Sequence, residues 1–185
     1  MQIQITKVNL DGLLTLQSIG RQTFSETFAP NNTVENMSKY LEEGFAEQKL
    51  MDELANQNSE FYFALIDHQV IGYLKLNYGQ AQTELKDSKA LEIERIYVLQ
   101  AYQGKNVGQL LYTKAIEVAK QASVDYVWLG VWEENHRALR FYQKNGFVPF
   151  DKHFFKLGNE EQTDILMKHY LSENQSIPTL NQSSL

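Results

Sequence analysis

The stretch LEIERIYVLQAYQGKNVGQLLYTKAIEVAKQA, residues 91–122, contains a strand pattern, a polar loop and a helix pattern in succession. Polar residues alternate with apolar ones over 91–98, which is typical of a strand. From Val107 onward, apolar residues recur every three to four positions, which predicts a helix. Between them, YQGKNVGQLL (102–111) places two glycines near the start of that helix. The stretch therefore predicts a strand–loop–helix unit with the loop at the carboxyl end of the strand, where open α/β sheets place ligands.

The flanking sequence predicts further strands and helices around this unit. Asp11, Thr33 and Asn135 are expected helix N-caps, and Gly146 follows the last helix. A tight polar turn at 67–69 joins two strands of a hairpin. The expected strands are 2–8, 60–67, 70–79, 91–98, 125–132, 147–157 and 162–171, and the expected helices are 12–29, 33–45, 46–57, 107–122 and 135–146. This order predicts an α/β (α+β) fold, a mixed central sheet of about seven strands with helices on both faces.

Length and composition limit the class of protein. A chain of 185 residues is expected to form one domain over 1–171, followed by a polar, flexible tail at 172–185. The chain has no cysteine, so a thiol nucleophile, a disulfide framework and a cysteine zinc site are excluded. We find neither a secretion signal nor an apolar run long enough to span a membrane, and expect a soluble, cytoplasmic protein without a membrane partner.

Charge is distributed unevenly along the chain. The net charge is −6, yet residues 101–144 carry 6 Lys and Arg against 4 Asp and Glu. A cationic middle suits an anionic ligand, although a chance scatter of solvated charges explains the count equally well. Overall acidity argues against a nucleic-acid partner. The four histidines, His68, His136, His153 and His169, show no metal-ligand spacing, so no metal site is expected.

Two blocks of sequence carry a family resemblance. Residues 103–108, QGKNVG, resemble the [QR]-x-x-G-x-[GA] signature of the GCN5-related N-acetyltransferases (GNAT family). Residues 128–147, WLGVWEENHRALRFYQKNGF, are similar to the fifth strand and following helix of that family. Within the family, LEIERIY (91–97), WLGVWEEN (128–135), EEQTD (160–164) and the region 26–42 resemble the Pai-type bacterial spermidine/spermine N-acetyltransferases. The resemblance implies an enzyme, an acetyl-CoA-dependent N-acetyltransferase with acetyl-CoA as cosubstrate.

The loop suits the pyrophosphate of acetyl-CoA for physical reasons. It opens a helix, so free N–H groups and the positive end of the helix dipole converge there. The peptide-like pantetheine arm can pair with strand backbone where the fifth strand diverges. Lys144 has a competing interpretation as a solvated lysine near a helix C-terminus. The predicted cofactor-binding residues are Ile96, Tyr97, Val98, Gln103, Gly104, Lys105, Asn106, Val107, Gly108, Gln109, Asn135 and Lys144.

Asn106 departs from the family signature, which has glycine at this position. Asparagine is the residue other than glycine that best tolerates the left-handed backbone region. We therefore expect a modest effect on affinity for acetyl-CoA and no loss of function.

The reaction requires an acid and a base. An alkylammonium must lose a proton before its nitrogen can attack the thioester, and Glu92 or Glu94 is the expected base. Strand alternation predicts that both glutamates share one face with Ile96 and Val98, and pairing with a nearby Arg or Lys is the alternative for each. The resemblance implies that Tyr142 is the general acid that protonates the leaving thiolate; a half-buried aromatic role beside Phe141 is the alternative. Direct attack in a ternary complex is expected.

The acceptor is inferred from the resemblance and from charge. Glu26, Glu42 and Glu43 lie in the region that forms the acceptor side in this family, and carboxylates suit a small cationic amine such as spermidine or spermine. Exposed helix faces explain each of these residues individually. A protein N-terminus or another small amine is an alternative acceptor, and an acetyl-CoA-binding regulator with little turnover is an alternative function. The sequence leaves open whether the protein forms a homodimer.

Overall fold

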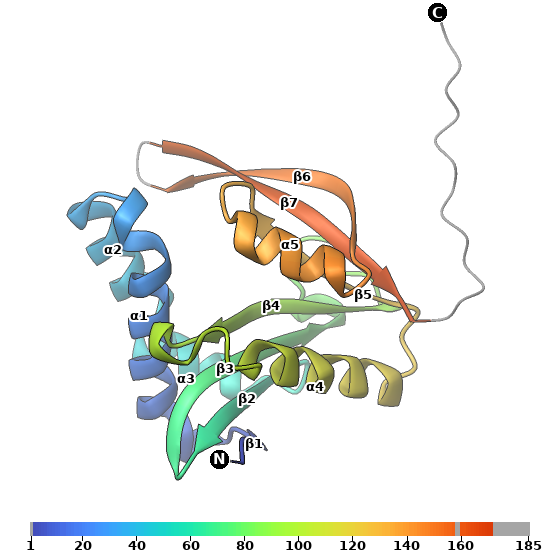
Figure 1. The fold of residues 1–185 in the computed structure, drawn as a ribbon, viewed down its shortest axis with the longest axis horizontal. Coiled ribbons are helices and arrows are strands. Elements are labelled where there is room, and N and C mark those ends of the chain that lie inside the picture. The colour runs from blue at the N-terminus through green and yellow to red at the C-terminus, as the bar shows by residue number, and fades with distance from the viewer. Residues whose placement is uncertain (1, 158–159, 172–185) are drawn as a thin grey trace, which may run out of the picture.

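The computed structural model describes residues 2–157 and 160–171, which build one seven-stranded sheet flanked by helices (Figure 1). The predicted tail at 172–185 lies outside the described residues. The strands are β1 (Gln4–Lys7), β2 (Ser59–Ile66), β3 (Gln69–Tyr78), β4 (Ala90–Val98), β5 (Tyr126–Trp132), β6 (Val148–Leu157) and β7 (Glu160–Tyr170). The helices are α1 (Leu13–Phe28), α2 (Val34–Gly44), α3 (Glu47–Ala55), α4 (Val107–Gln121) and α5 (His136–Lys144). The predicted fold class is confirmed.

The helices cover the sheet on both faces (Figure 1). Side chains of α4 and α5 pack with one face of the sheet in a core that includes Leu91, Leu111 and Tyr142. Side chains of α1, α2 and α3 pack on the other face in a second core that includes Phe61 and Tyr73. We call these the α4 face and the α1 face. Burial of apolar surface on both faces stabilises the layered arrangement.

The sheet runs in the order β1-β2-β3-β4-β5-β7-β6, and β4–β5 is its parallel pair. That pair is short, because it extends only from Ala90 opposite Tyr126 to Glu92 opposite Trp128. Beyond Glu92 the two strands diverge, as the sequence predicted. β5 pairs with β7 along the whole length of β5, and β6 forms the edge of the sheet. The carboxyl halves of β4 and β5 therefore border a gap in the middle of the sheet.

Local signals explain most element boundaries. Asp67 and His68 have φ of 46° and 66°, the left-handed pair that a tight hairpin between β2 and β3 requires. Thr33 caps α2 by accepting a hydrogen bond from the N–H of Asn36, as predicted. The predicted cap at Asp11 is wrong: Asn9 caps a short 3₁₀ turn at Leu10–Gly12, and α1 begins only at Leu13.

A β-bulge in β4 changes which side chains face the gap. Lys75 pairs with Arg95 and the next residue of β3 pairs with Ile93, which leaves Glu94 as an extra residue in β4. The alternation of side chains therefore shifts by one position at Glu94. The predicted common face of the glutamates with Ile96 and Val98 is wrong, because Ile96 and Val98 pack on the α4 face. The glutamates instead bond to Asn77 on the α1 face.

Candidate active site

A cavity of about 890 Å³ occupies the gap between β4 and β5 and reaches both faces of the sheet. Its walls include residues of α1, α2, β4, the β4–α4 loop, β5, α5, β6 and β7. Because the strands diverge, backbone that would otherwise pair across the sheet borders this space. The cavity is large enough for an extended cofactor together with a small second molecule.

At one end of the cavity, the β4–α4 loop turns through two left-handed residues. Gly104 has φ of 77° and Asn106 has φ of 66°, so the asparagine adopts the conformation expected for it. A Cβ atom at Gly104 or Gly108 would meet nothing within 4 Å, which leaves the backbone open to a ligand. The first N–H groups of α4 have no partner within the helix and point outward at this end. The loop is therefore built to receive an anion.

Most of the predicted cofactor-binding residues line the cavity. These are Ile96, Tyr97, Val98, Gln103, Gly104, Asn106, Gly108, Gln109, Asn135 and Lys144. The Lys105 side chain does not line it, and its Nζ lies 5.1 Å from the centroid of the Tyr102 ring. Val107 is buried in the core, so only its backbone N–H faces the loop. Asn135 uses Oδ1 to cap α5, accepting from the N–H of Ala138 at 3.1 Å, and among the described residues its amide nitrogen has no hydrogen-bond partner.

Hydrogen bonds hold the loop against β4 and α5. Gln103 donates from Nε2 to the carbonyl oxygen of Val98 at 3.2 Å and accepts from the Arg137 guanidinium. Gln109 donates to Asn145 Oδ1 at 2.9 Å. Arg137 also lines the cavity and was missed by the sequence analysis. Its position in the first turn of α5, two residues after the capping Asn135, was the available signal.

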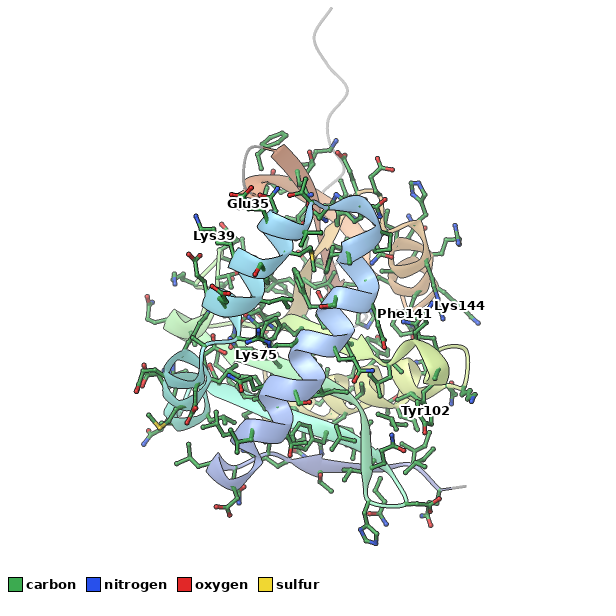
Figure 2. All side chains as sticks on the ribbon, turned by 90° about the vertical axis from the view of Figure 1, so that its left-hand side faces the viewer. Glu35, Lys39, Lys75, Tyr102, Phe141 and Lys144 are labelled. Atoms are coloured by element: carbon green, nitrogen blue, oxygen red, sulfur yellow. The ribbon has the colours of Figure 1, made fainter. Side chains whose placement is uncertain are left out.

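Figure 2 looks onto α1 and shows side chains on either side of this helix. Phe141 and Lys144 of α5 and Tyr102 of the loop lie on one side of α1, whereas Lys75 lies on its other side. Glu26 of α1 accepts from the N–H of Gln100 at 2.7 Å, so this predicted acceptor residue ties α1 to the start of the loop. Glu42 and Glu43 are exposed and do not line the cavity.

The two glutamates of β4 are both engaged by neighbours. Glu92 is buried and accepts from Asn77 Nδ2 at 3.0 Å, and from the N–H and hydroxyl of Thr83. It does not line the main cavity but a smaller pocket of about 170 Å³ beside it. Burial raises the pKa of Glu92, and the hydrogen bonds from Thr83 and Asn77 oppose that rise.

Glu94 lines the cavity and belongs to a buried charge network. Its carboxylate lies 2.6 Å from Lys75 Nζ and 3.5 Å from Arg95 Nε, and Lys75 also contacts Glu53 at 3.0 Å. Burial raises the pKa of Glu94, but the charges of Lys75 and Arg95 outweigh this and hold it below its ordinary value. Glu94 therefore pairs with basic residues, which was the predicted alternative to its role as a base.

Tyr142 lies on the α4 face, where α5 packs against the sheet. It is buried, lines the cavity and contacts the rings of Phe141 and Phe147 at centroid distances of 5.4 and 5.6 Å. Burial raises the pKa of its hydroxyl, which keeps the group protonated at neutral pH. A protonated hydroxyl that borders the cavity can donate a proton or a hydrogen bond there.

The wall opposite the loop is formed by residues that the sequence analysis did not select. Glu84, His153 and Asp164 line it, and His153 Nδ1 lies 3.4 Å from Glu84 Oε1. Trp132 and Phe28 add aromatic surface, with ring centroids 6.0 Å apart. These residues come from distant parts of the sequence, so no local pattern identified them.

A hydrogen bond closes the edge of this wall. Gln162 of β7 donates from Nε2 to Asn32 Oδ1 at 3.3 Å. Figure 1 shows the start of β7 approaching the α1–α2 connection. The contact bridges two elements on opposite sides of the cavity.

The fold and the cavity define an α/β protein whose central parallel strands part to receive an extended, phosphate-bearing molecule. A model of the Acetyltransferase (GNAT) family matches residues 22–147. The chain belongs to this family and is an acetyl-CoA-dependent N-acetyltransferase.

Similar proteins support this assignment over nearly the whole chain. An uncharacterized N-acetyltransferase in the pepI 3′ region of Lactobacillus delbrueckii subsp. lactis is 41% identical over 169 residues, covering 91% of this chain and 98% of the relative. A spermidine N(1)-acetyltransferase of Thermoplasma acidophilum is 28% identical over 151 residues, covering 80% of this chain and 89% of the relative. The crystal structure of PaiA N-acetyltransferase from Thermoplasma acidophilum in complex with coenzyme A superposes with a TM-score of 0.76 at 25% identity, covering 92% and 99% of the two chains.

The residues present fit acetyl-CoA as cosubstrate. The left-handed turn at Gly104 and Asn106 exposes backbone to a phosphate, and Arg137 and Lys144 add positive charge beside it. The diverging edge of β4 offers peptide groups to an amide-bearing arm. Throughout the described part of the chain, we find no helix long and apolar enough to cross a membrane.

Proposed function

We propose that residues 1–171 form one N-acetyltransferase domain that transfers the acetyl group of acetyl-CoA to a primary amine of a small polycation, with spermidine or spermine as the leading acceptors. The observation that carries this proposal is the division of charge in the cavity. Arg137 and Lys144 border the loop end, where Glu26 is bonded to the backbone of Gln100. Glu84, Glu94 and Asp164 border the opposite wall, where Arg95 is paired with Glu94. An anionic cofactor and a cationic acceptor are each attracted to a different end.

One relative supports the same acceptor class. One relative of known name is a spermidine N(1)-acetyltransferase, and the PaiA structure covers nearly the same length of chain. Apolar and aromatic surface from Phe28, Tyr40 and Trp132 lies beside the acidic wall. A polyamine consists of methylene segments between ammonium groups, so alternating carboxylate and apolar surface suits it.

For the cofactor, we propose that backbone does most of the binding. The N–H groups from Gly104 to Gln109 hold the pyrophosphate, and Ile96, Tyr97 and Val98 pair with the pantetheine arm through their backbone. Arg137 and Lys144 contribute charge, and the free amide nitrogen of Asn135 donates to the arm. Lys105 adds a weaker, longer-range charge, because it lies outside the cavity.

For the chemistry, we propose direct attack by the amine in a ternary complex, with Tyr142 as general acid. The Tyr142 hydroxyl gives its proton to the departing sulfur, and the tyrosine regains a proton from the newly acylated nitrogen. The chain has no cysteine to carry the acetyl group, which favours direct transfer. The raised pKa of Tyr142 keeps the proton in place until the sulfur becomes basic.

A thiol-release assay tests this function. Purified protein is incubated with acetyl-CoA and with spermidine, spermine, an N-terminal peptide or an aminoglycoside, and free thiol is followed. We expect the highest kcat/KM with spermidine or spermine, and we expect charge-reversing the acidic wall with Glu84→Lys to raise KM for the polyamine more than KM for acetyl-CoA. The exposed Glu43→Lys variant is the matched control, since Glu43 does not line the cavity.

Other outcomes assign the alternatives. Turnover of the peptide alone would assign a protein N-terminus as acceptor. Tight binding of acetyl-CoA without release of thiol in any mixture would identify an acetyl-CoA-binding regulator and overturn the proposed function.

A further inference from the structure

Asp164 of β7 borders the cavity on the α1 face of the sheet, opposite Tyr142. Its chain neighbour Ile165 and the residue Met167 pack in the α4-face core, so strand alternation directs Asp164 to the other face. Asp164 pairs with Trp132 of β5, and a Cβ on the nearby Gly130 would lie 3.5 Å from Asp164 Oδ2, an ordinary contact distance. The glycine therefore leaves the space beside this carboxylate open.

Asp164 differs from the glutamates of β4 in its partners. Glu92 receives three hydrogen bonds, and Glu94 is held by Lys75 at 2.6 Å. For Asp164, by contrast, we find neither a hydrogen bond nor an ion pair with any residue that the structure describes. A carboxylate that is already bonded must lose those bonds when it takes a proton, whereas Asp164 loses none.

We propose that Asp164, and neither glutamate of β4, takes the proton from the acceptor ammonium group. This proposal rests on the proposed function, since it requires a cationic amine in the acidic wall. Asp164 and Tyr142 then act from opposite faces of the sheet. The amine enters on the α1 face beside the base, and the sulfur departs toward the acid on the α4 face.

The surroundings of Asp164 suit a base that works near neutral pH. Burial raises the pKa of Asp164 to about 6, His153 lowers it and Glu84 raises it. A base of this pKa is ionised at neutral pH and still basic enough to accept a proton. The titratable groups that face Asp164 are His153 from β6, Glu84 from the β3–β4 connection, Glu92 and Glu94 from β4, and Tyr40 from α2.

The proton balance of the proposed step is complete. Asp164 removes one proton from R–NH₃⁺ and becomes a neutral carboxylic acid, leaving R–NH₂. The nitrogen lone pair forms the C–N bond to the acetyl carbonyl carbon, and the C–S bond breaks with its electron pair going to sulfur. Tyr142 protonates the sulfur and is reprotonated by the second nitrogen proton. Asp164 finally releases its proton to solvent, so the net products are the amide, the free thiol and one proton.

The test compares the pH dependence of kcat/KM for spermidine in the wild type and in Asp164→Asn. We expect a wild-type acidic limb near pH 6 and a loss of about 10²–10⁴-fold in the variant at neutral pH. The loss should shrink as pH rises toward the pKa of the amine, because solvent then supplies neutral amine. Asp151→Asn, an exposed change on the neighbouring strand β6, is the matched control and should leave the profile unchanged.

Two neighbouring variants separate a titrating base from a structural residue. Glu84→Gln should move the acidic limb to lower pH, because Glu84 raises the pKa of Asp164. His153→Gln should move it to higher pH, because His153 lowers that pKa. A limb that stays in place in both variants would overturn the proposal.

Thermal stability provides a second test that does not depend on enzyme activity. The folded pKa of Asp164 is raised, so its stabilising contribution is full below the unfolded pKa and is lost as pH rises through about 6. Asp164→Asn should therefore melt at a higher temperature than the wild type at neutral pH, with a difference that fades toward about pH 4. Unchanged turnover by a folded Asp164→Asn protein would refute the base role of Asp164 but not the proposed function. Absence of wild-type turnover with every amine would refute the proposed function, and this inference with it.

Discussion

The two ends of the cavity, proposed to hold the cofactor and the amine, are built by different means. The loop end is made of backbone, since Gly104 and Asn106 take left-handed conformations and the first turn of α4 presents N–H groups. The opposite wall is made of side chains, with Glu84, His153 and Asp164 coming from a connection and two strands. Backbone can hold a phosphate group with few specific side chains. If the proposed amine site is correct, the choice of amine depends on the individual side chains of the opposite wall. We therefore expect cofactor affinity to depend on local backbone conformation and acceptor choice to depend on tertiary assembly.

The largest expected effect on catalysis is at Tyr142, the proposed general acid, which lies between the two ends of the cavity. We expect Tyr142→Phe to lower kcat by about 10²–10⁴-fold, because the departing sulfur loses its proton donor. The dissociation constant for acetyl-CoA should stay within about twofold, since the ring still fills the same space. Thiol release and calorimetric titration measure the two quantities. Tyr126→Phe, outside the cavity, is the control; equal rates in both variants would remove the acid role of Tyr142.

Breaking the charge network beneath the acidic wall should affect stability. Lys75 is 5% exposed and contacts Glu53 and Glu94, so Lys75→Met removes the cation that these two half-buried carboxylates share and leaves Glu94 with Arg95 alone. We expect a loss of about 3–5 kcal/mol in the free energy of unfolding at neutral pH. Denaturant unfolding measures it. Lys89→Met, at a lysine whose side chain is 74% exposed, should change the value by less than about 0.5 kcal/mol.

The pH dependence of that loss gives a sharper test. The folded pKa of Glu94 is lowered, so its stabilising contribution is present above the unfolded pKa and is lost as pH falls through the folded pKa. The difference between wild type and Lys75→Met should therefore decrease below about pH 4. A difference that is constant with pH would show that Lys75 acts through packing.

At the loop end, side-chain charge should matter less. Arg137→Ala should raise KM for acetyl-CoA by about tenfold and leave KM for the amine nearly unchanged, because Arg137 borders the loop and bonds Gln103. Arg140→Ala, on the same helix but outside the cavity, is the control. Steady-state kinetics with each substrate varied in turn measures both constants. An equal rise in both KM values would contradict the division of the cavity.

The smallest effect is expected at Asn106. Asn106→Gly should keep or slightly improve acetyl-CoA binding, because glycine adopts φ of 66° without strain. Asn106→Ala should destabilise the fold by about 1 kcal/mol, since alanine tolerates this conformation poorly. Binding titrations and thermal melts distinguish the two. A large loss of affinity in the glycine variant would mean that the asparagine side chain itself contacts the cofactor.

Features encoded by neighbouring residues were predictable from sequence. The left-handed Asn106, the cap at Thr33 and the Gly146 that follows α5 with φ of 86° all depend on local backbone preferences. The bulge at Glu94 was not predictable, because it is set by the register of β3 against β4. Asp164 was missed for the same reason: β7 pairs between β5 and β6, and this pairing places Asp164 between Trp132 and His153.

The hydrogen bond between Gln162 and Asn32 joins residues 130 positions apart, and this separation has a consequence for synthesis of the chain. A ribosome releases the chain from the N-terminus, so all the residues proposed to hold acetyl-CoA, from Ile96 to Lys144, emerge before Asp164 and Gln162. The strand that completes the acidic wall is also the last strand of the sheet to be made. The wall proposed to select the amine is therefore the last part of the cavity to be synthesised.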